Sequence, residues 1–377
     1  LIDVFSILSV LISSVFKGYP NLYRVFESTE GKSCSFSRDA TYRFLSNPKY
    51  DWQSLMFNIA TFIIRFICDL NKDNKKQINC LVVDDTMIER SRGKKVELLS
   101  RQFNHVIGKN NKTFTDFVLG WTDGINHIPV LSYLIVSNRE NNLIRKADEN
   151  IIDNRTTCAK RKKTACKKKT EVLISMCRRT VRAISASYIL MDSWFFSDYL
   201  VRKLKELGLQ SICLVKSNLQ FKLLKDSSKS FSQIKLLKHI NGGRLNKSNL
   251  ITSIIAYTTK NLRVKLVFVK VRNSKDWICI VSTDLNLSPE KVIELYGRRW
   301  TIEVALAQRT HVRLMTLIPV MPLWLSQVSD YSSWSLTEDT ITILVLLGNF
   351  STVKISERYL GMTDYIKIYI QLPQTSQ

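Results

Sequence analysis

The stretch CLVVDDT, residues 80–86, determines which kind of sheet the chain has to build. A short apolar run that ends in two aspartates is typical of a buried β-strand carrying carboxylates to the rim of a sheet. A second run, SYILMDSWF (residues 187–195), leads into Asp192 in the same way. Strand phase alone does not decide between Asp84 and Asp85. The two runs predict two strands that each place an aspartate at the rim.

Helices and further strands alternate around these two runs. FTDFVLGWTDG (114–124) and HIPVLSYLIVS (127–137) read as extended segments with a glycine-containing turn between them. FSDYLVRKLKELGLQ (196–210) has an amphipathic pattern closed by Gly208, and the strand SICLVKS (211–217) follows it. This alternation predicts an α/β fold with a mixed sheet.

Residues 1–75 form a predicted helical N-terminal segment. The apolar stretch at 4–16 is too short to span a bilayer and is expected to be a buried helix. Ser37 is a predicted N-cap, and Asn47-Pro48 is the stop signal of the helix that follows it. Basic residues on such short helices suit DNA contact, but they suit an ordinary soluble helical cap equally well.

The residue composition and the expected secondary structure change near residue 217. A segment rich in lysine and serine is followed by three predicted strands, at 250–259, 264–272 and 276–284, which together resemble a β-rich insertion. The next helix has a clear start, with Ser288 as N-cap and Pro289 at the first helical position.

Composition narrows the class of partner. The chain has 377 residues with 45% hydrophobic residues, which excludes wholesale disorder. Its 56 Lys and Arg against 32 Asp and Glu give a net charge of +24. Such an excess indicates a polyanionic partner, with nucleic acid as the first choice and an anionic membrane surface as the alternative. Eight cysteines without a C-x-x-C pair indicate reduced thiols in a cytosolic chain.

The final predicted helix adds a third carboxylate. Tyr296, Arg299 and Glu303 are spaced i, i+3, i+7, which places them on one face of a continuous helix. Two strand aspartates and one helical glutamate could form an all-oxygen site for Mg²⁺, and two such ions can assist phosphodiester cleavage. Taken singly, the aspartates could be turn or capping residues and the helical face a solvated salt-bridged stripe. Their combination in so basic a chain favours a metal-dependent nucleic-acid enzyme.

Four motifs in order carry a resemblance to a known family. LVVDDT, RGKKVELLSRQFNHV (92–106), ILMDSWF and YGRRWTIE (296–303) resemble the transposases of bacterial insertion sequences in the DDE superfamily. The resembling group is marked by a Y-x(2)-R-x(3)-E-x(6)-K signature. The resemblance implies a ribonuclease-H-like core with a β-strand insertion before the glutamate helix. It also implies cut-and-paste transposition through a DNA hairpin, with Mg²⁺ or Mn²⁺, as two ions.

The resemblance also implies roles for particular residues. It assigns Asp85, the aspartate next to Thr86, together with Asp192 and Glu303, as catalytic residues and metal ligands. Tyr296 and Arg299 match the signature and would hold phosphates. The further DNA-binding residues expected are basic side chains beside these motifs: Arg298, Lys167, Lys168 and Lys169.

The signature is broken after the glutamate. Thr310 stands where the signature has Lys, and the nearby Arg309 and Arg313 are displaced from that position. Beyond Glu303 there are five basic and five acidic residues, so residues 1–303 carry the whole net charge. We therefore hypothesise that the reading frame or the gene departs from the family just after Glu303. A divergent but functional C-terminus is the alternative.

These observations define the expected organisation and function. Residues 1–75 are expected to form a DNA-contacting helical domain. Residues 76–216 and the catalytic helix at 288–310 are expected to form a ribonuclease-H-like core, with an insertion at 217–287 between them. Residues 311–377 are expected to be a divergent end. The expected function is DNA transposition by cleavage and strand transfer at terminal inverted repeats; the alternative is a degenerate, inactive DNA-binding copy. The expected partners are inverted-repeat and target DNA, with a dimer on DNA, no membrane, and a cytoplasmic, nucleoid-associated location.

Overall fold

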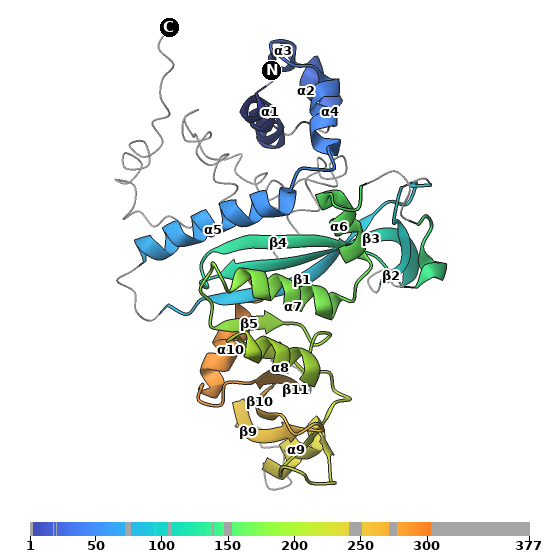
Figure 1. Cartoon of the computed structure of the whole chain (residues 1–377). Coiled ribbons are helices and arrows are strands. Elements are labelled where there is room, and N and C mark those ends of the chain that lie inside the picture. The colour runs from blue at the N-terminus through green and yellow to red at the C-terminus, as the bar shows by residue number, and fades with distance from the viewer. Residues whose placement is uncertain are drawn as a thin grey trace.

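The computed structural model describes residues 3–302 apart from 18, 20, 72–76, 95, 105–107, 138, 147–152, 241–250 and 271–276. Glu303, Thr310 and the segment 311–377 lie outside the described residues. The described part is an elongated α/β molecule built on one eleven-stranded mixed sheet (Figure 1). A group of helices lies at one end of the molecule, and the last strands of the sheet lie at the other.

The N-terminal region is helical, as predicted. Its helices are α1 (Val4–Phe16), α2 (Leu22–Glu27), α3 (Thr29–Lys32), α4 (Arg38–Ser46) and α5 (Trp52–Leu70). The Ser37 side chain accepts a hydrogen bond from the Ala40 amide at 3.2 Å, which confirms the predicted N-cap of α4. Helices α1, α2 and α4 share a small apolar core, which includes Leu11 and Leu22 and extends to Trp52 at the start of α5.

Helix α5 joins the helical group to the sheet. By length and composition it could cross a membrane, and it is the one described helix that meets both conditions. Nine of its residues are buried, and its apolar face packs on β4 (His127–Ile135) within the main core. Figure 1 shows it lying along the sheet. In this fold its apolar face is a core surface.

Five strands form the centre of the sheet. They are β1 (Cys80–Glu89), β3 (Lys109–Thr122), β4, β5 (Tyr188–Met191) and β6 (Gln210–Leu214). β3 is antiparallel to both β1 and β4, whereas β5 is parallel to β1 and to β6. The resulting order, β4-β3-β1-β5-β6, is a large mixed sheet and is compatible with a ribonuclease-H-like fold.

The two aspartates of the opening motif do not end their strand. β1 continues to Glu89 because its antiparallel pairing with β3 continues to the pair Glu89 and Thr113. Its parallel neighbour β5 stops at Met191. Asp84 and Asp85 therefore lie inside a strand, at the level where one of its two neighbours has ended.

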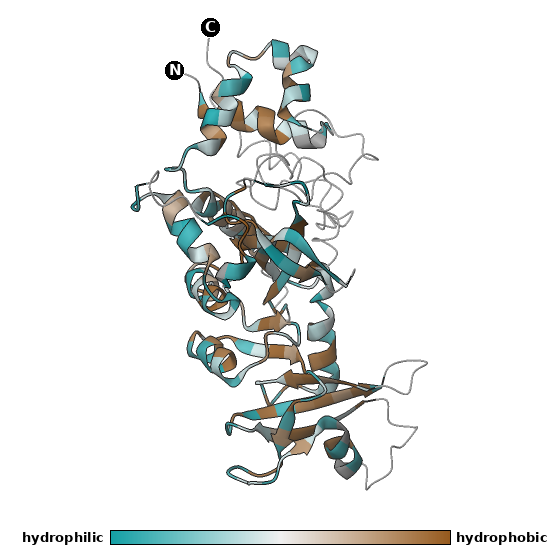
Figure 2. Cartoon of the chain, turned by 90° about the vertical axis from the view of Figure 1, so that its right-hand side faces the viewer, coloured by the Kyte–Doolittle hydropathy of each residue, from teal (hydrophilic) through white to brown (hydrophobic). Residues whose placement is uncertain are grey.

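The predicted strands between residues 250 and 284 are confirmed, and they extend the same sheet. They are β9 (Ile251–Thr258), β10 (Arg263–Lys270) and β11 (Trp277–Ser282), and β11 pairs with β6. The remaining small elements of the sheet and its edges are β2 (Ser100–Asn104), η1 (Glu140–Asn142), β7 (Gln220–Lys222), β8 (Phe231–Ser232) and α9 (Gln233–Ile240). Strand residues carry much of the hydrophobic colour in Figure 2.

Helices cover the two faces of the central strands. α5, α7 (Lys169–Thr180) and α8 (Asp198–Glu206) pack on one face, where Leu81 and Val83 point. α10 (Pro289–Gly297) packs on the other, with Val82. The basic stretch before β5 forms two helices, α6 (Thr157–Ala165) and α7, with a break at residues 166–168.

Gly208 closes α8 with a backbone φ of +82°. A side chain at this position has open space but an unfavourable left-handed backbone, so we expect Gly208→Ala to lower the free energy of unfolding by about 1 kcal/mol. Gly297 is the matched control, because it also has open space but lies in a helix without a positive φ. Gly297→Ala should leave stability unchanged or raise it. Equal thermal midpoints for wild type and Gly208→Ala would contradict the argument.

Candidate functional site

The helix α10 begins as predicted and ends early. Ser288 accepts a hydrogen bond from the Lys291 amide at 3.2 Å, with Pro289 in the first turn. Helical structure reaches Ile302, but it is not the one continuous helix that was predicted: α10 ends at Gly297, residues 298–299 form a turn, and residues 300–302 are helical again. The amides of Arg299, Thr301 and Ile302 bond to carbonyls three residues back, which tightens the chain.

Arg299 nevertheless lies with Tyr296, as the spacing predicted, and Arg299 also contacts a β1 aspartate. The Arg299 guanidinium is 5.7 Å from the Tyr296 ring centroid. Its Nη1 donates to Asp84 Oδ2 at 3.3 Å, and the whole residue is only 7% exposed. A guanidinium with so little contact with water needs a carboxylate partner, and Asp84 supplies one.

Asp192 belongs to the same side of the sheet. The parallel register pairs Val82 with Leu190, so two residues further Asp84 and Asp192 occupy equivalent positions on the α10 face. Burial raises the pKa of Tyr296 to about 12; Arg299 opposes this rise and Asp192 adds to it. Tyr296 therefore remains a protonated hydrogen-bond donor, within electrostatic reach of Asp192.

Asp85 points to the opposite face. Its Oδ2 accepts a hydrogen bond from Lys169 Nζ at 2.6 Å, at the first turn of α7. The same ammonium lies 5.2 Å from the ring centroid of Trp194. Strand alternation thus separates the two aspartates: Asp84 pairs with Arg299, whereas Asp85 pairs with Lys169. The choice of Asp85 as catalytic residue stays a prediction, and it was made without the register that separates them.

Arg298 holds the end of α10 against the sheet. Its Nη1 donates to the carbonyls of Ile78 at 2.6 Å and Asp123 at 3.0 Å, and its Nη2 donates to Glu294 at 3.0 Å. Gly124 has φ +100°, and a Cβ there would come within 2.9 Å of the guanidinium. These contacts favour a structural role for Arg298 over the predicted DNA contact.

The remaining predicted site residues differ in accessibility. Lys167 and Lys168 are exposed at the break between α6 and α7, while Lys169 is partly buried in its pair with Asp85. Glu303 follows the last described residue, Ile302. Local sequence patterns left the choice between Asp84 and Asp85 open and gave no sign of the contact between Trp194 and Lys169, because neither strand register nor the packing of α7 can be read from them.

The carboxylates near this site are suitable ligands for a hard divalent cation. The carboxylates on the α10 face are those of Asp84 and Asp192, and the chain next supplies Glu303. All are oxygen donors, which suit Mg²⁺ or Mn²⁺ better than a soft metal. Among the described residues no group of three His, Cys, Asp or Glu side chains could hold a metal. A complete metal site needs a ligand from outside them.

A carboxylate rim beside a buried arginine and a protonated tyrosine defines a class of site that handles phosphate esters. The chain belongs to the DDE superfamily endonucleases, whose family model matches residues 24–226. The model of the transposase DDE domain matches residues 142–313, which include Asp192, Arg299 and Glu303. These matches identify a nuclease-type enzyme family and support a transposase-type function. No curated protein sequence matches the chain.

We predict that Arg298→Lys lowers the free energy of unfolding by about 2 kcal/mol, because a lysine cannot bond two carbonyls and a carboxylate with a planar fork. Thermal denaturation of the full chain measures the loss. Lys167→Gln is the control, because it removes an exposed cation and should alter only the salt dependence of DNA binding. An Arg298→Lys variant as stable as wild type but weaker on DNA would restore the original prediction.

His127 supports the same corner of the molecule and should make it sensitive to acid. Its Nδ1 is 3.4 Å from Thr301 Oγ1, and burial lowers its pKa to about 4. Between pH 6.5 and 4 the His127 imidazole binds a proton in the unfolded chain but not in the folded chain, so the free energy of unfolding falls as the pH falls. We expect about 2 kcal/mol of extra loss between pH 7.5 and 5, relative to His127→Gln, in urea unfolding. Parallel pH profiles for the two proteins would refute this.

Proposed function

We propose that this protein is the transposase of an insertion sequence, cutting and joining DNA at terminal inverted repeats with divalent metal ions. The observation that carries the proposal is the ion pair of Arg299 with Asp84, beside Tyr296 and Asp192, in a chain of the DDE superfamily. Four groups suited to phosphate chemistry meet where β5 ends. The basic balance of the chain fits the same substrate.

The proposed metal ligands are Asp192, Glu303 and one aspartate of β1. The sequence resemblance assigns Asp85, but sheet alternation and the Arg299 contact favour Asp84, because it shares a face with Asp192. Bound Mg²⁺ would activate the attacking water or 3′ hydroxyl and stabilise the leaving oxygen. Asp85 then has a different task, which is to hold Lys169.

Tyr296 and Arg299 would position the phosphate that is cut. The phenol is kept protonated by burial, so it can donate to a phosphate oxygen. The Arg299 fork can bind two phosphate oxygens if DNA draws it away from Asp84. That exchange would free a carboxylate for metal at the moment when phosphate arrives. Lys167 and Lys168 would contact backbone phosphates without reading sequence.

The remaining expectations belong to the same proposal. The enzyme would act on double-stranded inverted-repeat and target DNA, as a dimer around paired ends, by cut-and-paste through a hairpin, in the cytoplasm at the nucleoid. Residues 1–75 would contact DNA, 76–216 with 288–310 would form the catalytic core, and 217–287 would be its insertion. Residues 311–377 would be a divergent end. A degenerate, inactive copy is the alternative, motivated by Thr310 in place of the signature lysine.

The test is Mg²⁺-dependent cleavage of DNA that carries the ends of the encoding element, by the purified 377-residue chain. We expect Asp84→Asn and Asp192→Asn to abolish cleavage, a loss of at least about a thousandfold, because removing a charged metal ligand weakens stabilisation of the transition state. Asp85→Asn should keep measurable activity. Loss with Asp85→Asn and retention with Asp84→Asn would reverse the assignment.

A further arm decides between enzyme and inactive copy. If wild type binds the ends but does not cut, Thr310→Lys is tested under the same conditions. Cleavage only after this change would identify a degenerate copy, whereas cleavage by both would mean that the signature lysine is dispensable. A chain that cuts all DNA equally, without preferring the element's ends, would argue for a general nuclease.

A further inference from the structure

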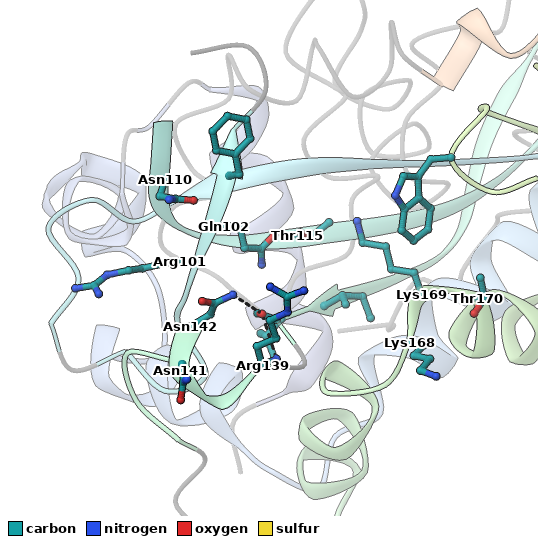
Figure 3. Close-up of a pocket in the computed structure, with 15 residues that line it drawn as sticks. Arg101, Gln102, Asn110, Thr115, Arg139, Asn141, Asn142, Lys168, Lys169 and Thr170 are labelled. Atoms are coloured by element: carbon teal, nitrogen blue, oxygen red, sulfur yellow. Dashed lines mark hydrogen bonds between the residues drawn. The ribbon is translucent and has the colours of Figure 1, made fainter. Parts of the chain in front are cut away.

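A large open cavity lies on the α7 side of the sheet and shares only Lys168 and Lys169 with the function proposed above. Its volume is about 810 Å³, within the range of roughly 300–1,000 Å³ typical of ligand sites. Fifteen residues line it, from β2, β3, the end of β4, the region around η1, the start of α7 and the loop after β5 (Figure 3). In Figure 3 the residues of β2 and η1 lie across from Lys168, Lys169 and Thr170.

The lining of this cavity is strongly basic. It contains Arg101, Arg139, Lys168 and Lys169, and none of its fifteen residues is acidic. Lys169 is paired with Asp85, but Arg101, Arg139 and Lys168 are exposed and make no ion pair with another described residue. Exposed cations gathered around one hollow attract phosphate groups.

An exposed tryptophan stands at the edge of the same cavity. Trp194 is 53% exposed, although tryptophan normally buries most of its surface. Its ring is held in place by an edge contact with Phe195 at 5.0 Å between centroids and by Lys169 at 5.2 Å. A fixed, solvent-facing indole beside cations is the arrangement on which single-stranded nucleic acids stack their bases.

Polar groups that can contact a base edge complete the lining. Asn110 and Asn141 are exposed there, and each amide offers both a donor and an acceptor. Asp85 fixes the Lys169 ammonium beneath the indole, and Asp192 lies two residues before Trp194. The cavity is thus linked by short segments of chain to both faces of the carboxylate rim.

We propose that this cavity binds one unpaired nucleotide of a DNA single strand, with the base stacked on Trp194 and the flanking phosphates on Arg101, Arg139 and Lys168. A base inside a duplex is already stacked and cannot reach the indole, so the ligand is a strand that has been opened. This inference rests on the proposed function for its choice of DNA as ligand. In that setting the opened strand is the one next to the phosphate being cut.

The test measures binding of a fluorescein-labelled 15-mer of thymidine to the full chain by anisotropy, without divalent metal. We expect Trp194→Ala to lower single-strand affinity about tenfold, Trp194→Phe to retain most of it, and duplex affinity to stay the same. Tyr199→Ala is the matched control, because it removes an exposed aromatic ring of α8 outside the cavity. Unchanged affinity of a folded Trp194→Ala would overturn the proposal.

A second pair of variants keeps the test decisive if Trp194→Ala does not fold. The double variant Arg101→Gln with Arg139→Gln should weaken the salt dependence of single-strand binding. The slope of log affinity against log salt should fall by about 0.7 for each phosphate that the protein no longer neutralises. The control Lys205→Gln, on α8, should leave the slope unchanged. An unchanged slope would also overturn the proposal. Because these measurements need no cleavage, an inactive chain that still shows both effects separates failure of the catalytic proposal from failure of this one.

Discussion

The three-way contact of the Arg298 guanidinium is the constraint on which the rest of the site depends. It joins the carbonyl of Ile78, just before β1, to that of Asp123, in the turn between β3 and β4, and to Glu294 on α10. Three segments separated by up to 220 residues in the chain are thereby locked at one corner. The next residue, Arg299, contacts Asp84 from the position at which Arg298 anchors the chain.

The second organising feature is that β1 divides its two aspartates between opposite faces. On the α10 face, Asp84 pairs with a nearly buried arginine that lies against Tyr296; on the α7 face, Asp85 pairs with a lysine beside an exposed tryptophan. One dipeptide thus serves two environments of different chemistry. In the function proposed above, the first would hold a metal and the scissile phosphate, and the second would hold the nucleotide next to it. A single strand can in this way connect catalysis to the placement of its substrate.

Sequence reasoning succeeded where the signal was local. The caps at Ser37 and Ser288, the helix closed by Gly208 and the strands between residues 250 and 284 were predicted because each depends on neighbouring residues. It failed where distant segments compete. The extension of β1 to Glu89 comes from pairing with β3, and the early end of α10 comes from a turn after Gly297 that helical spacing does not reveal. Arg298 looked like a DNA contact because its carbonyl partners lie elsewhere in the chain.

By itself, the sequence determined the α/β class, the basic character, the ordered motifs that resemble DDE transposases, and the candidates Asp192, Tyr296, Arg299 and Glu303. These follow from composition and from spacing along the chain, which need no knowledge of the fold. Only the tertiary structure decided which β1 aspartate shares a face with Asp192, and that Lys169 and Trp194 stand together at a basic cavity. The reason is physical: the direction of a side chain depends on strand register and helix packing, which residues far apart in sequence impose together.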